Sequence, residues 1–239
     1  MKTIVRIAAC AAALMLASTA AFAQRHPEKV YFSYQNPMSK DLGRKGNDVH
    51  AELLGQYWFG FTTPTPSSGS LGLDVDTWRS FSFGMSLASV SARVQGNVYF
   101  NAAVRWSFEN YVNAKNYEYY DLDGHICADP LVGAGNVRKS KMRADYLGIP
   151  VGFSVKADDL MVYANISAEV LTAARSKVKA DNNVLKDDIG GLSMFRSCVE
   201  AGISYGCLGV FARYTLTSMY TDISGVQYRP VTFGLTLGF

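Results

Sequence analysis

The stretch from Val231 to Phe239 reads Val-Thr-Phe-Gly-Leu-Thr-Leu-Gly-Phe. Every second residue is a large apolar one, and the residues between them are threonine or glycine. A period of two puts alternate side chains on opposite faces of a β-strand, so this segment predicts a strand with one fully apolar face. A transmembrane β-barrel closes its last strand against its first and turns such a face toward the lipid. The segment therefore favours a membrane barrel over a soluble fold.

The beginning of the chain has the pattern of a secretory signal peptide. A positively charged start precedes a run of apolar and small residues, and Ala21-Phe22-Ala23 is an A-x-A cleavage site. We expect residues 1–23 to direct export and to be removed. Residues 24–48 are polar and irregular and are expected to form a periplasmic extension, followed by the barrel domain at residues 49–239.

The composition excludes several classes of protein. The formal net charge is +3, which gives no electrostatic reason to expect a nucleic-acid partner. No segment after residue 23 has the roughly 18 consecutive apolar residues of a transmembrane helix. The strands of a membrane barrel contain no such segment either, because about half of their residues are polar. The chain is therefore either an exported soluble protein or a membrane barrel. Cys127, Cys198 and Cys207 follow the signal peptide, and their odd number predicts no disulfide framework.

The same alternation recurs along the rest of the chain. It predicts eight strands, the last of which begins near Tyr228. The other seven are His50–Phe61, Trp78–Ala92, Val98–Glu109, Asp145–Lys156, Leu160–Thr172, Phe195–Tyr205 and Leu208–Tyr220. Strands of about ten residues have the length of tilted membrane strands. Pro150 has no amide hydrogen for the ladder, so we expect a bulge or local irregularity in the fourth strand.

The connections between these strands alternate in length. Tight turns are predicted near Gly96, Asp158 and Gly206. The long loops are residues 62–77, 111–143, 174–194 and 221–227. Bacterial outer-membrane barrels have short periplasmic turns, longer extracellular loops and an even number of strands. We therefore predict an all-β fold, an eight-stranded antiparallel up-and-down transmembrane β-barrel that is integral to the bacterial outer membrane and monomeric.

Three short motifs stand in the second half of the chain. They are Asp-Tyr-Leu-Gly-Ile-Pro-Val at residues 145–151, Asp-Ile-Gly-Gly at residues 188–191, and the pair Arg213-Tyr214. In this order they resemble a strand motif, the glycine-bearing stretch before the sixth strand and a pair in the seventh strand of the PorT-like outer-membrane β-barrel proteins of Bacteroidetes. The resemblance covers residues 49–239 and implies an eight-stranded outer-membrane barrel, but it implies little about activity.

The apolar face of the last strand has a second interpretation. Phe233, Leu235, Leu237 and Phe239 lie on that face. With an aromatic residue at the end of the chain, they resemble the signal by which the barrel-assembly machinery recognises such proteins. We expect this machinery, together with the lipid and lipopolysaccharide of the outer membrane, to be the partners of the chain.

The faces that point into the predicted barrel carry charged residues. They are Glu52, Arg105, Glu109, Glu169, Glu200 and Arg213, with Arg196 near one end of its strand. The interior of an eight-stranded barrel is only wide enough for its own side chains, and buried charges need partners. We expect a structural network in which Arg105 and Arg213 pair with glutamates and fill the lumen. A narrow ion-conducting path is the alternative.

No pattern in the sequence predicts catalysis or a bound cofactor. The histidines of the chain are His26, His50 and His125. A lipid hydrolase needs a nucleophile beside a histidine base, and none of these histidines shares an outward strand face with a nearby serine. Residues 121–129 place aspartates around a glycine as a calcium loop does, but without its full spacing and closing glutamate. We predict no enzyme activity, no metal and no cofactor, with an outer-membrane lipid-modifying enzyme as the alternative.

Aromatic and basic residues outside the predicted lumen indicate how the barrel would meet the membrane. Aromatic residues are expected in two girdles at the two interfaces. The outer girdle would include Trp78, Trp106, Phe108, Tyr111, Tyr220 and Tyr228, and the inner one Phe100, Tyr205 and Phe239. The basic residues Arg175, Lys177, Lys179 and Lys186 fall in the third long loop. They are expected to form a solvated face, with contact to anionic lipopolysaccharide as a second role.

These observations lead to a functional prediction without a named ligand. We expect an outer-membrane barrel of structural or interaction type, which supports membrane integrity, adhesion or surface binding through its extracellular loops. The alternatives are a lipid-modifying enzyme and a narrow pore.

Overall fold

The computed structural model describes residues 31–33, 49–64, 75–113, 117–123, 125–131, 137–180, 183–221 and 227–238. The predicted signal peptide, nearly all of the predicted extension and Phe239 lie outside the described residues. In the part of the chain that the structure describes, no helix has the length and apolar character needed to cross a membrane.

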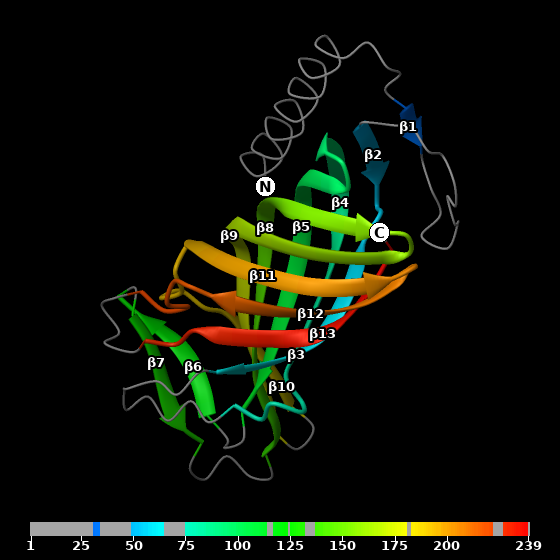
Figure 1. The fold of residues 1–239 in the computed structure, drawn as a ribbon. Helices are drawn as coiled ribbons and strands as arrows, with labels where there is room; N and C mark the ends of the chain where they lie inside the picture. The colour runs from blue at the N-terminus through cyan, green and yellow to red at the C-terminus, as the bar shows by residue number, and fades with distance from the viewer. Residues whose placement is uncertain are drawn as a thin grey trace.

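Eight strands close into a ring in which each strand is antiparallel to both neighbours (Figure 1). They are β3 (Tyr57–Pro64), β4 (Phe81–Gln95), β5 (Val98–Val112), β8 (Val137–Ala157), β9 (Leu160–Ala180), β11 (Phe195–Tyr205), β12 (Leu208–Thr215) and β13 (Pro230–Leu237). Each pairs with the next in this order, and β13 pairs with β3 to close the ring. The predicted fold class, an eight-stranded antiparallel β-barrel, is confirmed.

The other described strands lie outside the ring. They are β1 (Tyr31–Ser33), β2 (Val49–Leu53), β6 (Tyr117–Leu122), β7 (His125–Pro130) and β10 (Asn183–Asp188). β2 pairs with one end of β4 and carries β1 on its free edge, in a parallel pairing. β6 and β7 form a separate hairpin, and β10 pairs with the end of β9.

The connections sort by length onto the two ends of the barrel. Two-residue connections follow β4, β8 and β11, and they begin with Gly96, Asp158 and Gly206, each of which has a positive φ. Tight hairpins need such a backbone, and glycine adopts it without steric cost. These turns define the short-turn rim. The longer connections, with β10 and the β6–β7 hairpin, define the opposite long-loop rim (Figure 1).

Several of the predicted strand boundaries were wrong, among them the end of the seventh strand, because β12 ends at Thr215 and not at Tyr220. The first predicted strand is divided at residues 54–56 into β2 and β3, where Leu54 has a φ of 55°. β8 and β9 extend into the predicted loops 111–143 and 174–194, and both have 21 residues. Both extensions alternate as strands do, because Met142 and Val178 are buried while the alternate residues are charged, although in β9 the phase reverses at the register shift opposite Asp145.

Pro150 interrupts the ladder on one side only. It pairs in register with Ser167 of β9, whereas the ladder from β8 to β5 has a gap between Ala102 and Arg105. Proline has no amide hydrogen to donate, which explains a gap on one side. The expected irregularity is therefore a local break in pairing rather than a bulge. The two register shifts of the β8–β9 ladder lie elsewhere, between Val137 and Lys139 and between Asp145 and Tyr146.

The wall of the barrel is apolar outside and polar inside. In β13, Phe233 is 40% exposed and Leu235 and Leu237 are each 52% exposed, whereas Thr232 and Thr236 are 2% exposed. The other strands repeat this pattern, with exposed Phe153, Val162, Ile166, Val199, Ile203 and Val210 on the outer face. Soluble proteins rarely expose so continuous an apolar surface. The outer face is therefore suited to a lipid environment and the inner face to a network of polar side chains.

Candidate functional site

The barrel interior contains two clusters of ion pairs. The first, the Glu200 cluster, consists of Arg105, Glu200 and Arg213. Arg105 donates from Nη1 to Glu200 Oε2 at 2.8 Å and from Nη2 to Oε1 at 3.1 Å. Arg213 donates from Nε to Glu200 Oε2 at 2.7 Å. One carboxylate from β11 thus holds guanidinium groups from β5 and β12, which gives three strands a common contact inside the barrel.

The second, the Arg196 cluster, consists of Glu109, Glu169 and Arg196. It has one arginine between two glutamates, whereas the Glu200 cluster has one glutamate between two arginines. Arg196 donates from Nη1 and Nη2 to the two carboxylate oxygens of Glu109 at 2.7 and 2.8 Å, and from Nε to Glu169 at 2.7 Å. The hydroxyl groups of Tyr111 and Ser167 donate to Glu109 and Glu169 respectively. Together the two clusters hold three arginines and three glutamates, so their formal charges balance.

Apolar layers enclose these charges from both ends. Trp58, Met161, Tyr163 and Phe211 form the layer nearer the short-turn rim. The guanidinium carbons of Arg105 and Arg213 lie 4.5 and 5.1 Å from the Trp58 ring centroid. A larger layer toward the long-loop rim contains Tyr111, Met142, Tyr146, Ile189, Leu192, Met219, Tyr220 and Tyr228. Arg196 lies 3.4 Å from the Tyr146 ring centroid, which joins this layer to the Arg196 cluster.

The predicted outer aromatic girdle needs a correction. Tyr111, Tyr220 and Tyr228 are each 1% exposed and pack against one another inside the barrel, with the Tyr228 ring 5.9 Å from Tyr111 and 5.7 Å from Tyr220. Tyr111 has the same parity in β5 as Arg105 and Glu109, so its side chain must point inward too. Trp78, at 73% exposed, does lie on the surface.

The structure brings together five of the six charged residues predicted for the lumen. Glu52 does not join them. Its carboxylate lies 2.6 Å from Nε2 of His50 at the short-turn rim. The break at residues 54–56 separates β2 from the ring, so Glu52 belongs to the edge of the barrel rather than to its interior. Arg196 does lie near one end of its strand, as the second residue of β11, and it binds two of the glutamates.

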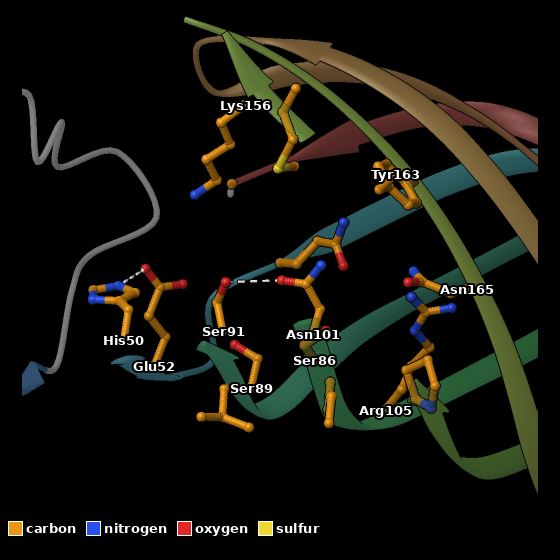
Figure 2. Close-up of a pocket in the computed structure, with 17 residues that line it drawn as sticks. His50, Glu52, Ser86, Ser89, Ser91, Asn101, Arg105, Lys156, Tyr163 and Asn165 are labelled. Carbon is orange, nitrogen blue, oxygen red and sulfur yellow. Dashed lines mark hydrogen bonds and ion pairs between the residues drawn. The ribbon is translucent and has the colours of Figure 1, made fainter. Parts of the chain in front are cut away.

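A hollow of about 110 Å³ lies where the interior meets the short-turn rim (Figure 2). Its lining includes His50, Glu52, Ser91, Asn101 and Lys156. Ser91 stands opposite His50 in the β2–β4 pairing, but its hydroxyl donates to Asn101 at 2.8 Å. Nε2 of His50 lies 2.6 Å from Glu52, and no hydrogen bond among the described residues joins a serine hydroxyl to this histidine.

The aspartates predicted to resemble a calcium loop lie on the β6–β7 hairpin. Leu122 pairs with His125, so Asp123 is in the two-residue connection, where its φ is 53°. Asp121 and Asp129 belong to different strands of the hairpin. Among the described residues, no group of three or more histidine, cysteine or acidic side chains gathers closely enough to hold a metal ion.

Comparison with known proteins gives a structural likeness but no family. No protein-family model matches the chain, and neither does any curated protein. Among solved structures, the chain is similar to the crystal structure of Neisserial surface protein A. The two share 15% sequence identity with a TM-score of 0.38, over 77% of this chain and 97% of the other. A likeness at this level carries no argument about function.

Proposed function

We propose that the chain is a monomeric, integral barrel of the bacterial outer membrane with a closed lumen. Its role is structural or interactive, and its long-loop rim faces the exterior of the cell. The observation that carries this proposal is that the barrel has exposed apolar side chains outside and paired charges inside, the reverse of a soluble protein. A lipid bilayer covers such an outer surface, and a closed ring of strands leaves no backbone edge unpaired within it.

The closed lumen follows from how the interior is filled. Two apolar layers enclose two charge-balanced clusters whose arginines and glutamates are at most 7% exposed. An ion crossing the barrel would have to separate ion pairs in a medium of low dielectric constant, which is costly. This argues for a structural network over the alternative of a conducting path.

A catalytic role has weaker support. A lipid-modifying enzyme of the hydrolase type needs a serine within hydrogen-bonding reach of its base, and Ser91 is bound to Asn101 instead. We therefore propose a protein without enzyme activity. The barrel-assembly machinery is its proposed partner during insertion, and the motifs that resemble PorT-like barrels agree with this proposal without assigning a process.

Fractionation of cells that express the full-length chain tests the proposal. We expect the protein in the outer-membrane fraction, resistant to extraction by salt or alkali. We also expect its gel mobility to change on heating, because a closed barrel withstands detergent until it is boiled. Recovery in the soluble periplasmic fraction, or a mobility that heating leaves unchanged, would count against an integral barrel.

A further inference from the structure

The ends of β8 and β9 at the long-loop rim carry basic side chains on one face. Lys139 pairs with Lys179, Lys141 with Lys177, and Arg143 with Arg175. We call these six residues the basic ladder. Their alternate neighbours, among them Ser140, Met142, Ser176 and Val178, are buried on the other face of the ribbon. The strand period therefore places all six basic side chains on the outer face.

This arrangement costs stability. Like charges directly opposite one another on neighbouring strands repel. The row extends to a third strand, because Lys186 of β10 stands opposite Lys177 on the side away from Lys141. Lys177 thus has a lysine directly opposite on both sides. Burial and the nearby charges of Lys139, Lys177 and Arg143 lower the pKa of Lys141.

Few acidic groups offset these charges. Arg143 is paired with Asp145 at 2.8 Å and Arg175 with Asp188 at 3.2 Å. No ion pair to a carboxylate is formed by Lys139, Lys141, Lys177 or Lys179 within the described residues. Lys141 donates to the amide oxygen of Asn110 at 2.6 Å, which does not neutralise it. Among the residues that the structure describes, the four lysines of the ladder therefore concentrate positive charge that no carboxylate pairs with.

The ladder begins where the apolar wall ends. On β8 the outward residues Phe153, Val151, Ile149 and Leu147 lead to Asp145 and then to Arg143. Successive outward positions on a strand are about 7 Å apart, so the first basic residue lies within about 15 Å of the last apolar one. Arg143 also rests 4.6 Å from the ring centroid of Phe108. This is the depth at which the headgroups of a surrounding lipid layer would lie.

We propose that the basic ladder binds the phosphate groups of an anionic lipid headgroup in the outer leaflet. The inference rests on the proposed function, since only an integral barrel brings the ladder to that depth. Charge complementarity identifies phosphate as the ligand chemistry, because three rows of opposed cations suit a headgroup with more than one phosphate. Continuity with the apolar wall favours a lipid over a soluble polyanion, because the acyl chains of the same molecule would cover the wall below the ladder.

Native mass spectrometry of the folded, detergent-solubilised full-length protein tests the inference, with diphosphorylated lipid A and its dephosphorylated form as probes. The variant Lys141→Gln/Lys177→Gln removes the central rung. Arg79→Gln/Arg229→Gln removes two charges elsewhere at the same rim and is the matched control. We expect the first variant to bind diphosphorylated lipid A about twenty-fold more weakly than wild type, since each basic residue near an anionic surface contributes about fivefold. The control should bind like wild type, and the dephosphorylated lipid should not distinguish the three proteins.

The inference would be overturned if the ladder variant and the control variant lost affinity for diphosphorylated lipid A equally. It would also be overturned if the wild-type protein did not prefer the phosphorylated lipid. Displacement of the lipid by soluble tripolyphosphate at equal phosphate concentration would also overturn it, because the ligand would then be phosphate in general. Insertion into vesicles of uncharged phosphatidylcholine, read by the heat-dependent gel shift, tests the proposed function alone. If the protein inserts into these vesicles but does not prefer the phosphorylated lipid, only the proposed lipid binding by the basic ladder is refuted, and the proposed function stands.

A second variant separates binding from folding. Lys177→Glu places an acidic residue between Lys141 and Lys186 and replaces repulsion by attraction on both sides. We expect this variant to resist urea at least as well as wild type in phosphatidylcholine vesicles while binding diphosphorylated lipid A more weakly than Lys141→Gln/Lys177→Gln. If the folded variant bound diphosphorylated lipid A as tightly as wild type, the proposed lipid binding by the basic ladder would be refuted.

Discussion

Arg196 of β11 and Glu109 of β5 form a bidentate ion pair across the barrel interior, with distances of 2.7 and 2.8 Å, although 87 positions separate them in the chain. The same guanidinium also binds Glu169 of β9. All three residues are buried: the two glutamates are at most 2% exposed, and Arg196 is 3% exposed. One arginine therefore compensates two buried carboxylates, from β5 and β9, which β8 separates in the ring.

Replacing Arg196 by methionine should destabilise the barrel strongly. The change leaves Glu109 and Glu169 buried without their cation, and breaking a buried pair in this way costs about 3–5 kcal/mol. Urea unfolding in lipid vesicles measures the loss. The triple variant Glu109→Gln/Glu169→Gln/Arg196→Met removes the charges together and should be more stable than the single variant. A single variant as stable as wild type would refute the structural role of the cluster.

A positive charge in the middle of the outer wall should impair insertion. Ile166 is 51% exposed on β9, and an arginine at the midplane of a membrane barrel costs about 2–4 kcal/mol. We expect Ile166→Arg to lower the amount of protein in the outer membrane. Val184→Arg is the control, since Val184 is 47% exposed on β10, beyond the wall. Equal effects of the two changes would show that the wall does not face lipid.

A methyl group at Gly84 should disturb the apolar layer near the short-turn rim. A Cβ atom there would overlap the Trp58 indole and lie 2.6 Å from the carbonyl oxygen of Trp106. Overpacking of this kind costs about 1–3 kcal/mol, so Gly84→Ala should unfold at lower urea concentration. Gly96→Asn serves as the control, because nothing lies within 4 Å of an added Cβ at that turn and asparagine tolerates its φ of 54° better than most residues. A Gly84→Ala variant with unchanged urea resistance would contradict the tight contact with Trp58.

The terminal aromatic residue should matter for assembly rather than for stability. If Phe233, Leu235, Leu237 and Phe239 act as the signal for the assembly machinery, Phe239→Ser should lower outer-membrane levels in cells. Refolding of the purified variant into vesicles without that machinery should be unchanged. Phe153→Ser removes an aromatic side chain of the outer wall from β8 and should leave cellular assembly near normal. If the Phe239→Ser variant reached normal levels in the outer membrane of cells, these residues would not act as an assembly signal.

The sequence predicts the wall of this barrel well because strand parity is a local property. Arg105 and Glu109 in β5 and Glu200 in β11 could be assigned to the interior from the alternation alone. The same rule places Tyr111 inside and holds through the charged end of β8, but in β9 the buried positions change from odd to even numbers where the register shifts opposite Asp145. Parity therefore predicts the face of a residue only between bulges, and the shift in β9 depends on its pairing with β8.

The pairing of charges could not be predicted in the same way. Which arginine meets which glutamate depends on the stagger of the strands around the ring, which sets the heights of Arg196 and Glu109 relative to each other. The exclusion of Glu52 depends on the backbone at Leu54, whose φ of 55° divides the first strand. Both are consequences of long-range closure and not of the pattern within one strand.

Conductance across a planar bilayer tests the closed lumen most directly. The purified full-length protein is inserted, its heat-dependent gel shift is used to verify the folded state, and current is recorded under an applied voltage. With the interior filled by the Glu200 and Arg196 clusters and their apolar layers, we predict no steady single-channel current. A large and steady conductance from the wild-type protein would contradict a closed barrel.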